Sequence, residues 1–334
     1  MAYQFTNDYS YLTHPRFLKA LEKYSNEHQV AYGLDKHSFN ASNNIKDIFD
    51  VPHASIHYLA GGTQTNMVLI SSAIKHYEGV IAVDTGHINV HETAAIEGSG
   101  HKIITVKGNN GKIYPNDIIE VMELNNNEHM VKPALVFISN STEIGTIYTR
   151  KELLDLREVC DEYGLYLYLD GARLGSALTS KECDYEPSFL GHVLDAFYIG
   201  GTKNGMLFGE ALVIVNEQLQ KDFRYAIKNK GAMLAKGYAV GIEFEEAFKD
   251  GLYFDIAKAT NEVADYLKDK LNISSKEQPT NQIFITLDNA KANDVINKFG
   301  TEMWVKGDKQ SEIRIVISFM TTRKDVDELI KFLQ

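Results

Sequence analysis

The region from about residue 51 to residue 215 alternates short apolar runs with segments whose apolar residues recur at helical spacing. This alternation restricts the fold strongly, because it is typical of α/β proteins, in which helices cover a mostly parallel sheet. It predicts helices over residues 65–77, 115–125 and 150–163. The predicted strands are residues 55–61, 79–84, 101–107, 134–140, 165–170, 196–201 and 208–215.

The pattern changes after residue 215. Long helical segments over residues 231–251 and 254–271 precede a mixed stretch. The mixed stretch predicts a strand at 281–287, a helix near 293–299, a strand at 312–319 and a terminal helix from Arg323. We therefore predict an N-terminal arm and helix (residues 1–50), a large domain (51–215), and long helices with a small C-terminal α/β domain (216–334).

Charge and cysteine content exclude several functional classes. The 34 Lys and Arg residues against 45 Asp and Glu residues give a net charge of -11, which argues against nucleic acid or an anionic membrane as partner. Cys160 and Cys183 have no CxxC spacing, so we predict neither a disulfide framework nor a metal site. The N-terminal residues do not resemble a signal peptide and no run is long enough to span a membrane, which predicts a cytoplasmic protein.

Residues that directly follow the predicted strands are candidates for a ligand site, because open parallel sheets bind ligands beyond the carboxyl ends of their strands. Gly62 and Thr63 follow the first strand and open an apolar helix, where free backbone N–H groups suit a phosphate. A tight turn without a ligand is the alternative. The segment is neither a GxGxxG fingerprint nor a P-loop.

Two further strand ends carry opposite charges. Asp170 ends the apolar strand "LYLYLD", and a buried carboxylate is costly unless it meets a cation. Lys203 follows "AFYIGG", where desolvation would lower its pKa and favour reaction with a carbonyl group, although a lysine on an exposed turn is the alternative. Together with the Gly62 turn, these residues suit one ligand with a phosphate, an aldehyde and a basic ring nitrogen, and pyridoxal 5'-phosphate has all three.

Four segments carry a family resemblance: "YLAGGTQTN", "DTGHINVHETAAIEGSGHK", "LYLDGARLGSAL" and "GGTKNGMLFGEALV". They resemble the low-specificity L-threonine aldolases, which are fold-type I (aspartate aminotransferase-like) pyridoxal phosphate enzymes. The resemblance extends from about Asp8 to Arg314, and "AYGLD" at residues 31–35 matches more loosely. It implies a large domain with a mostly parallel sheet and a smaller C-terminal α/β domain. It also implies a homodimer or homotetramer in which a neighbouring subunit completes each site.

The resemblance assigns roles to individual residues. It implies that Lys203 binds the cofactor aldehyde, that Asp170 pairs with the ring nitrogen, and that His87 stacks on the ring. The phosphate would be held by Gly62, Thr63 and Thr202, and the substrate carboxylate by Arg173 and Arg314. By periodicity alone, Arg314 could instead be an outward residue of its strand, and Arg173 could cap or pair locally. We expect His91 and Glu92 to be structural, although the resemblance places Glu92 at a position that the family uses near the cofactor.

The chain departs from the family pattern at two places. Glu143 stands where many bacterial members have a second histidine, so the group that takes the β-hydroxyl proton is Glu143, His87 or a bound water. Leu234 stands near the place of an arginine that reaches the neighbouring subunit's phosphate. Three lysines near Leu234 are candidates to replace that arginine: Lys228, Lys230 and Lys236.

The expected activity is retro-aldol cleavage of L-threonine or L-allo-threonine to glycine and acetaldehyde. An alternative on the same fold is β-elimination from an aromatic or sulfur-containing amino acid. A non-catalytic protein that binds the cofactor is an alternative of another class. All three take a small amino acid or the cofactor itself as ligand.

Overall fold

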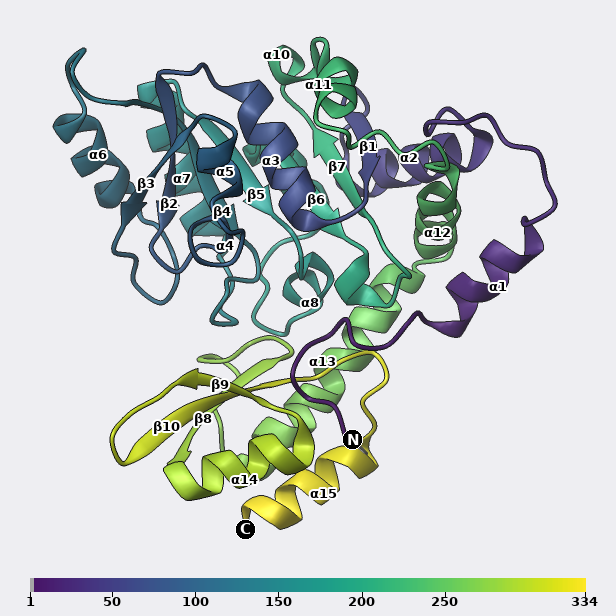
Figure 1. Cartoon of the computed structure of the whole chain (residues 1–334), viewed down its shortest axis with the longest axis vertical. Coiled ribbons are helices and arrows are strands. Elements are labelled where there is room, and N and C mark those ends of the chain that lie inside the picture. The colour runs from purple at the N-terminus through teal and green to yellow at the C-terminus, as the bar shows by residue number, and fades with distance from the viewer. Residues whose placement is uncertain (1–2) are drawn as a thin grey trace.

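The computed structural model describes residues 3–334 (Figure 1). Its larger sheet has seven strands in the order β1-β7-β6-β5-β4-β2-β3. Only β7 runs against the others, because it pairs antiparallel with both β1 and β6. The strands are β1 (Ser55–Leu59), β2 (Glu78–Val83), β3 (Lys102–Val106), β4 (Lys132–Ser139), β5 (Tyr166–Asp170), β6 (Ala196–Gly200) and β7 (Glu210–Ile214). The seven predicted strands and the mostly parallel sheet are therefore confirmed.

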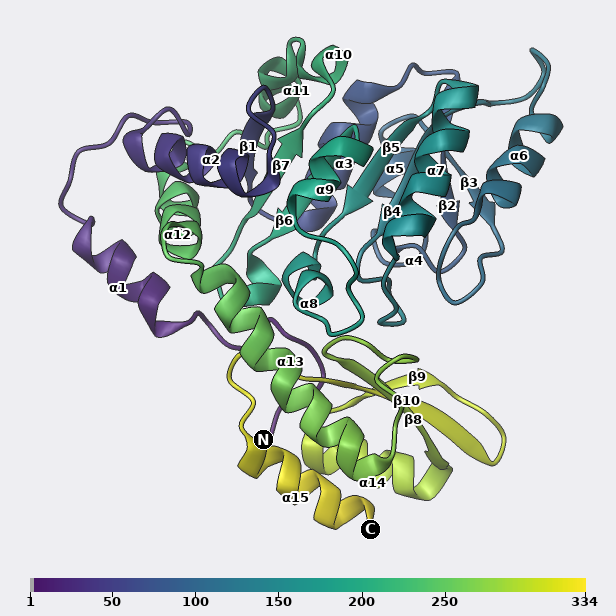
Figure 2. The same cartoon turned by 180° about the vertical axis from the view of Figure 1, so that it is seen from behind.

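Helices cover both faces of this sheet (Figures 1 and 2). Side chains alternate along each strand, so that in β5 Leu167 and Leu169 join one apolar core and Tyr168 joins the other. The first core packs against α2 (Lys36–Phe49), α6 (Pro115–Leu124), α7 (Arg150–Tyr163), α9 (Ser188–Val193) and α12 (Tyr238–Lys249). The second packs against α3 (Gly62–Ala73), α5 (Ala95–Gly98) and α11 (Phe223–Asn229).

Local sequence explains where these helices begin and end. In α7, the Thr149 side chain accepts a hydrogen bond from the Glu152 N–H and Glu152 bonds back, which is a capping box. The helix ends at Gly164, whose φ of 65° suits glycine. The remaining short elements are α4 (His87–Val90), α8 (Leu174–Leu178), the 3-10 turn η1 (Thr202–Asn204) and α10 (Glu217–Gln220).

A second sheet of three antiparallel strands lies at the C-terminal end of the chain (Figure 1). The long helix α13 (Leu252–Leu271) leads into it from the larger sheet. Its strands and helices are β8 (Gln282–Asp288), α14 (Asn289–Phe299), β9 (Glu302–Val305), β10 (Gln310–Val316) and α15 (Arg323–Leu333). Sequence periodicity missed β9, a strand of four residues, because so short a run shows no clear alternation.

The N-terminal region contains two helices in its described part, α1 (Pro15–Lys23) and α2, whereas one was predicted. Ahead of α1, Phe5 inserts into the core of the small sheet.

Residues 231–237, predicted as helical, precede α12 as turns. The division of the chain into three parts stays a prediction. Within residues 3–334, no helix has both the length and the apolar character needed to cross a membrane.

The carboxyl ends of β5 and β6 approach each other closely enough to require glycine. A Cβ on Gly171 would lie 1.9 Å from the Tyr198 carbonyl oxygen, and one on Gly200 would lie 2.3 Å from the Ala172 carbonyl oxygen. The glycine of "DGAR" and the first glycine of "GGTK" therefore bring the segments that carry Asp170 and Lys203 together.

Replacing Gly171 by alanine should lower the free energy of unfolding by about 1–3 kcal/mol, because the backbone must shift to admit the methyl group. Urea unfolding followed by far-ultraviolet circular dichroism measures this change. The matched control is Gly98→Ala, where nothing lies within 4 Å of the added Cβ. We expect the control to change stability by no more than about 0.5 kcal/mol, and equal stabilities for the two variants would contradict the steric argument.

Candidate active site

The candidate site lies at the carboxyl edge of the larger sheet. Asp170 ends β5, α3 follows β1, α4 follows β2, and η1 follows β6. Groups from these segments meet: the backbone N–H of His87 donates to Glu143 Oε1 at 2.9 Å, and Asn66 Nδ2 donates to Asp170 Oδ2 at 3.0 Å. Glu143 follows β4, so the structure brings together residues at or after the ends of β1, β2, β4 and β5, and Lys203 follows β6 at the same edge, as expected for an open α/β sheet.

Asp170 is buried and held on two sides. The Ala172 N–H donates to Oδ1 at 3.0 Å, and Asn66 donates to Oδ2. These bonds orient the carboxylate but provide no cation, so its burial suits a cationic ring nitrogen placed against it.

Asn66 links Asp170 to His87. Its amide also donates to Glu92 Oε1 at 2.8 Å, and Glu92 Oε1 lies 2.8 Å from His87 Nδ1. The Tyr168 hydroxyl donates to Asn66 Oδ1 at 2.8 Å and fixes the orientation of the amide. Sequence reasoning gave Asn66 no role, although it lies one helical turn after Gly62 and therefore near the same edge.

His87, Glu92 and Asp170 also form the one group of potential metal ligands within residues 3–334, with ligand atoms all within 4.8 Å of one another. Glu92 Oε1 and Asp170 Oδ2 already accept hydrogen bonds from Asn66. We therefore assign this group to the cofactor site, and the prediction of no metal stays a prediction.

Lys203 lies in η1, close to the charges of Arg173, Asp8 and Asp170. Burial lowers the pKa of its ammonium and Arg173 lowers it further, while the two carboxylates oppose this shift. A lysine with a lowered pKa is more often the neutral amine, which is the form that attacks a carbonyl group.

Two buried carboxylates hold the loop that carries Lys203. The Gly201 N–H donates to Glu210 Oε2 at 2.8 Å, and the Leu207 N–H donates to Glu243 Oε1 at 2.7 Å. Burial raises the pKa of Glu210 to about 8 and that of Glu243 to about 7. Both were missed from the sequence, since an acid in an apolar strand or helix does not reveal which backbone it meets.

The predicted phosphate site combines the start of α3 with Thr202. No side chain caps α3, so its first N–H groups remain free for an anion. A Cβ on Gly62 would lie 2.8 Å from the Tyr198 hydroxyl oxygen, which leaves no room for a side chain. Thr63 is exposed, and Thr202 Oγ1 accepts a hydrogen bond from the Gly209 N–H at 3.1 Å.

Glu143 is buried beside His87. Its Oε1 accepts hydrogen bonds from Ser139 Oγ at 2.7 Å and from the backbone N–H of His87. Its Oε2 is buried and has no partner within the described residues. Burial raises the pKa of this carboxyl, and the nearby Asp170 charge adds to the effect. A carboxyl group with one free oxygen and a raised pKa suits proton transfer.

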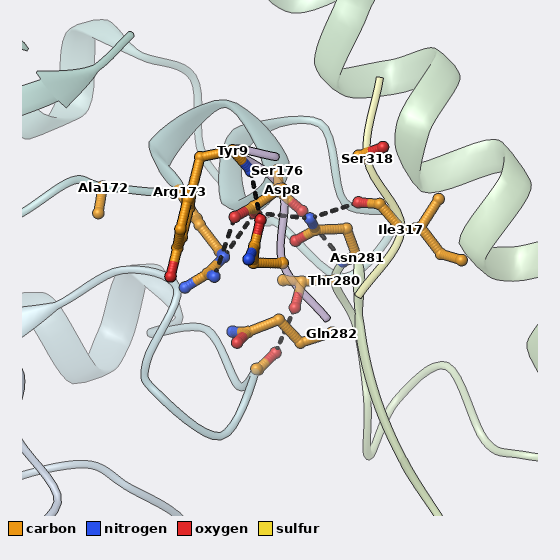
Figure 3. A network of polar contacts seen from close by, with 12 residues as sticks. Asp8, Tyr9, Ala172, Arg173, Ser176, Thr280, Asn281, Gln282, Ile317 and Ser318 are labelled. Carbon is orange, nitrogen blue, oxygen red and sulfur yellow. Dashed lines mark hydrogen bonds and ion pairs between the residues drawn. The ribbon is translucent and has the colours of Figure 1, made fainter. Parts of the chain in front are cut away.

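Arg173 and Arg314 both lie inside the protein. Arg173 pairs with Asp8, 165 residues away, so the alternative of a local pair or cap is wrong (Figure 3). The Arg314 side chain leaves the face of β10 opposite the core residues Ile313 and Ile315, as the alternation indicates, but there it is only 12% exposed and pairs with Glu302. Burial lowers the pKa of Arg314, the Arg173 charge lowers it further, and Arg314 Nε has no partner among residues 3–334.

These residues fit pyridoxal 5'-phosphate. The uncapped α3 suits its phosphate, the buried Asp170 suits its ring nitrogen, and Lys203 suits its aldehyde. Buried polar atoms without partners also lie in this region, namely Glu92 Oε2, Ser141 Oγ and Glu143 Oε2.

Comparison with known proteins gives the family. A family model for beta-eliminating lyases matches residues 15–293. A low specificity L-threonine aldolase from a Pseudomonas species is 31% identical over 255 residues, which cover 76% of this chain and 73% of that protein. The structure of a Leishmania major threonine aldolase is 40% identical, covers 99% of this chain and 98% of its own, and has a TM-score of 0.96.

A more distant structure shares the fold alone. Cystalysin from Treponema denticola, whose structure contains pyridoxal 5'-phosphate, is 16% identical with a TM-score of 0.70, covering 99% of this chain and 89% of its own. The predicted fold type I is therefore confirmed. Since the family model spans most of the sequence, the chain belongs to the beta-eliminating lyase family, and its resemblance to the low-specificity L-threonine aldolases is confirmed.

Proposed function

We propose that the protein is a pyridoxal phosphate-dependent carbon–carbon lyase that cleaves L-threonine and L-allo-threonine to glycine and acetaldehyde. The observation that supports this proposal is that Lys203 and Arg173 line one cavity together with Ala172, whose N–H donates to Asp170 Oδ1 at 3.0 Å. The similarity to threonine aldolases supports the choice of substrate.

The residues divide the task of holding the cofactor. Lys203 would bind the aldehyde and Asp170 would pair with the ring nitrogen, while His87, whose Nδ1 is held by Glu92, would stack on the ring. Gly62, Thr63 and Thr202 hold the phosphate. When bound, the cofactor supplies an electron sink for the charge that develops when a bond to Cα breaks.

The two arginines hold the substrate α-carboxylate. Planar guanidinium groups bind carboxylates through paired hydrogen bonds, and such pairs fix orientation as well as position. By fixing the carboxylate, Arg173 and Arg314 decide which bond at Cα is aligned for cleavage. For the proposed reaction this is the Cα–Cβ bond.

Glu143 takes the proton from the β-hydroxyl group. Its free oxygen is Oε2, and its other oxygen is held by Ser139 and the His87 N–H. Loss of this proton lets the hydroxyl carbon leave as the carbonyl of acetaldehyde. A proton returned to Cα then completes glycine, so the atoms of threonine are fully divided between the two products.

We also propose that a second copy of the chain completes each site, in a dimer or tetramer. Large apolar side chains are exposed together along the N-terminal region: Tyr9, Tyr11, Leu12, Leu18, Val30, Tyr32, Leu34 and Phe39. Tyr9 lies beside Lys203, with Lys203 Nζ 6.0 Å from its ring centroid, so a partner that covers this region reaches the site. The partner's cation would be Lys228, Lys230 or Lys236, and location in the cytoplasm stays a prediction from sequence.

Replacing Lys203 by alanine tests cofactor and activity together. The wild-type protein should be yellow, change its visible absorbance with L-threonine, and release acetaldehyde. The variant should lack these absorbance changes and lose activity by at least about 1,000-fold, because its nucleophilic amine is gone. The control is Lys181→Ala, since Lys181 is exposed and pairs with Asp265 away from the site. Wild-type protein that binds the cofactor but yields ammonia and a keto acid would instead show β-elimination.

Replacing Glu143 by glutamine should separate activity from stability. The wild-type rate should rise with pH as the Glu143 carboxyl deprotonates. This rise should occur at a higher pH than an ordinary glutamate needs, because burial raises the pKa of Glu143. The variant should lose this pH dependence and about 100- to 1,000-fold in kcat. A raised native pKa means that the stability contributed by Glu143 is present at low pH and lost as pH rises through that pKa, so the variant should be no less stable than wild type at pH 8.

Thermal unfolding at pH 5 and pH 8 measures the stability of the variant and of the wild type. The matched control is Glu97→Gln, because Glu97 is exposed. If the Glu143→Gln variant keeps the wild-type kcat, Glu143 does not take the β-hydroxyl proton, and His87 or a water does.

A further inference from the structure

Asp8 is a buried carboxylate that the proposed reaction does not use. Arg173 bonds it at two points, with Nε–H donating to Oδ2 at 2.7 Å and Nη2–H donating to Oδ1 at 3.1 Å. Asp8 is only 1% exposed. Figure 3 shows it lying between Arg173 and Asn281, whose Nδ2 donates to Asp8 Oδ2 at 3.1 Å.

The N-terminal segment that carries Asp8 is fixed to the small sheet. The Phe5 N–H donates to the Gly300 carbonyl at 3.0 Å, and the Val316 N–H donates to the Phe5 carbonyl at 2.8 Å. Asn281 Nδ2 also donates to the Ile317 carbonyl at 2.8 Å. Asp8 therefore connects Arg173, which follows β5 of the larger sheet, with the sheet that carries Arg314.

The bonding pattern decides which part of Arg173 is available to a ligand. A guanidinium group has five N–H donors in one plane, arranged along its edges. Asp8 occupies the edge formed by Nε and Nη2, so the edge formed by the two terminal nitrogens is the one left for a second carboxylate.

Asp8 also balances the charge of the site. Burial by itself would raise the pKa of Asp8, but the charges of Arg173 and Lys203 lower it below its usual value. Its negative charge in turn stabilises the charged forms of Arg173, Lys203 and Arg314. Asp170 also raises the pKa of Lys203, so Asp8 and Asp170 both offset the buried cations.

We infer that Asp8 is a positioning residue for substrate recognition: it holds the inner edge of Arg173 and the N-terminal segment in place, so that the outer edge of the guanidinium binds the substrate carboxylate. This inference rests on the proposed function, because it takes Arg173 as a carboxylate-binding residue. The opposite role is a carboxylate that competes with substrate for Arg173.

Asp8→Asn tests the inference in the holoenzyme. Glycine and methylamine are titrated separately while the visible absorbance of the cofactor is followed, since both are amines but only glycine has a carboxylate. The variant should raise the apparent dissociation constant for glycine by about tenfold or more, because the neutral amide no longer holds the guanidinium by a bidentate ion pair. The constant for methylamine should stay within about twofold of wild type, and KM for L-threonine should rise more than kcat falls.

The matched control is Glu246→Gln, which breaks another ion pair of the N-terminal region, Arg16 Nη2 to Glu246 Oε1 at 2.7 Å. This control should leave both constants unchanged. Tighter glycine binding in Asp8→Asn would show that Asp8 competes with substrate, and equal weakening for glycine and methylamine would show a purely structural role. Either result overturns the inference.

Two further observations keep the test decisive. If Asp8→Asn does not fold, Asn281→Ala removes the neutral donor to Asp8, and a smaller loss confined to glycine is expected. An unchanged glycine constant there overturns the inference. Wild-type protein whose absorbance does not respond to glycine at all would instead contradict the proposed function.

Discussion

The structure depends on the balance of buried charge at the carboxyl edge of the larger sheet. Acidic groups gather there, chiefly Asp170, Glu143 and Glu210, and the cations Lys203 and Arg173 lie among them. Buried charges are costly unless they are paired or hydrogen-bonded, so each of these groups restricts where its neighbours can lie. The raised pKa of Glu143 and the lowered pKa of Lys203 result from the same burial that makes the site reactive.

Pairs that hold this edge together join segments far apart in the chain. Asn66 and Asp170 are 104 residues apart, and Asp8 and Arg173 are 165 residues apart. One bond joins helix α3 to the end of β5, and the other joins the N-terminal segment on the small sheet to Arg173 at the edge of the larger sheet, so the site forms only when the whole chain has folded. Close approach of backbone at Gly171 and Gly200 adds a steric condition to this electrostatic one.

Much of the fold and part of the site were predictable from sequence. The periodicity of apolar residues and the turn-forming residues between them predicted all seven strands of the larger sheet. The rule that ligands bind at the carboxyl ends of strands then selected Asp170, Lys203 and Gly62. Periodicity placed Arg314 on the face opposite Ile313 and Ile315, which lie in the small-sheet core, but it could not show that this face is covered, so that the Arg314 side chain is only 12% exposed. Asn66 and Asp8 were missed, since their partners are distant in sequence and no local pattern marks a residue that will be paired in this way. Glu210 was missed because an acid in an apolar strand does not reveal which backbone N–H it will accept.

The sequence by itself determined the alternation of strands and helices, the glycines where backbones approach, and the residue types that suit a phosphate, an aldehyde and a ring nitrogen. These follow from local preferences and from side-chain chemistry. Only the tertiary structure decided that Glu143 keeps one free buried oxygen and that Asp8 occupies one edge of Arg173. Burial and hydrogen-bond partners arise from packing between distant segments, and such packing sets the pKa and the orientation of a side chain.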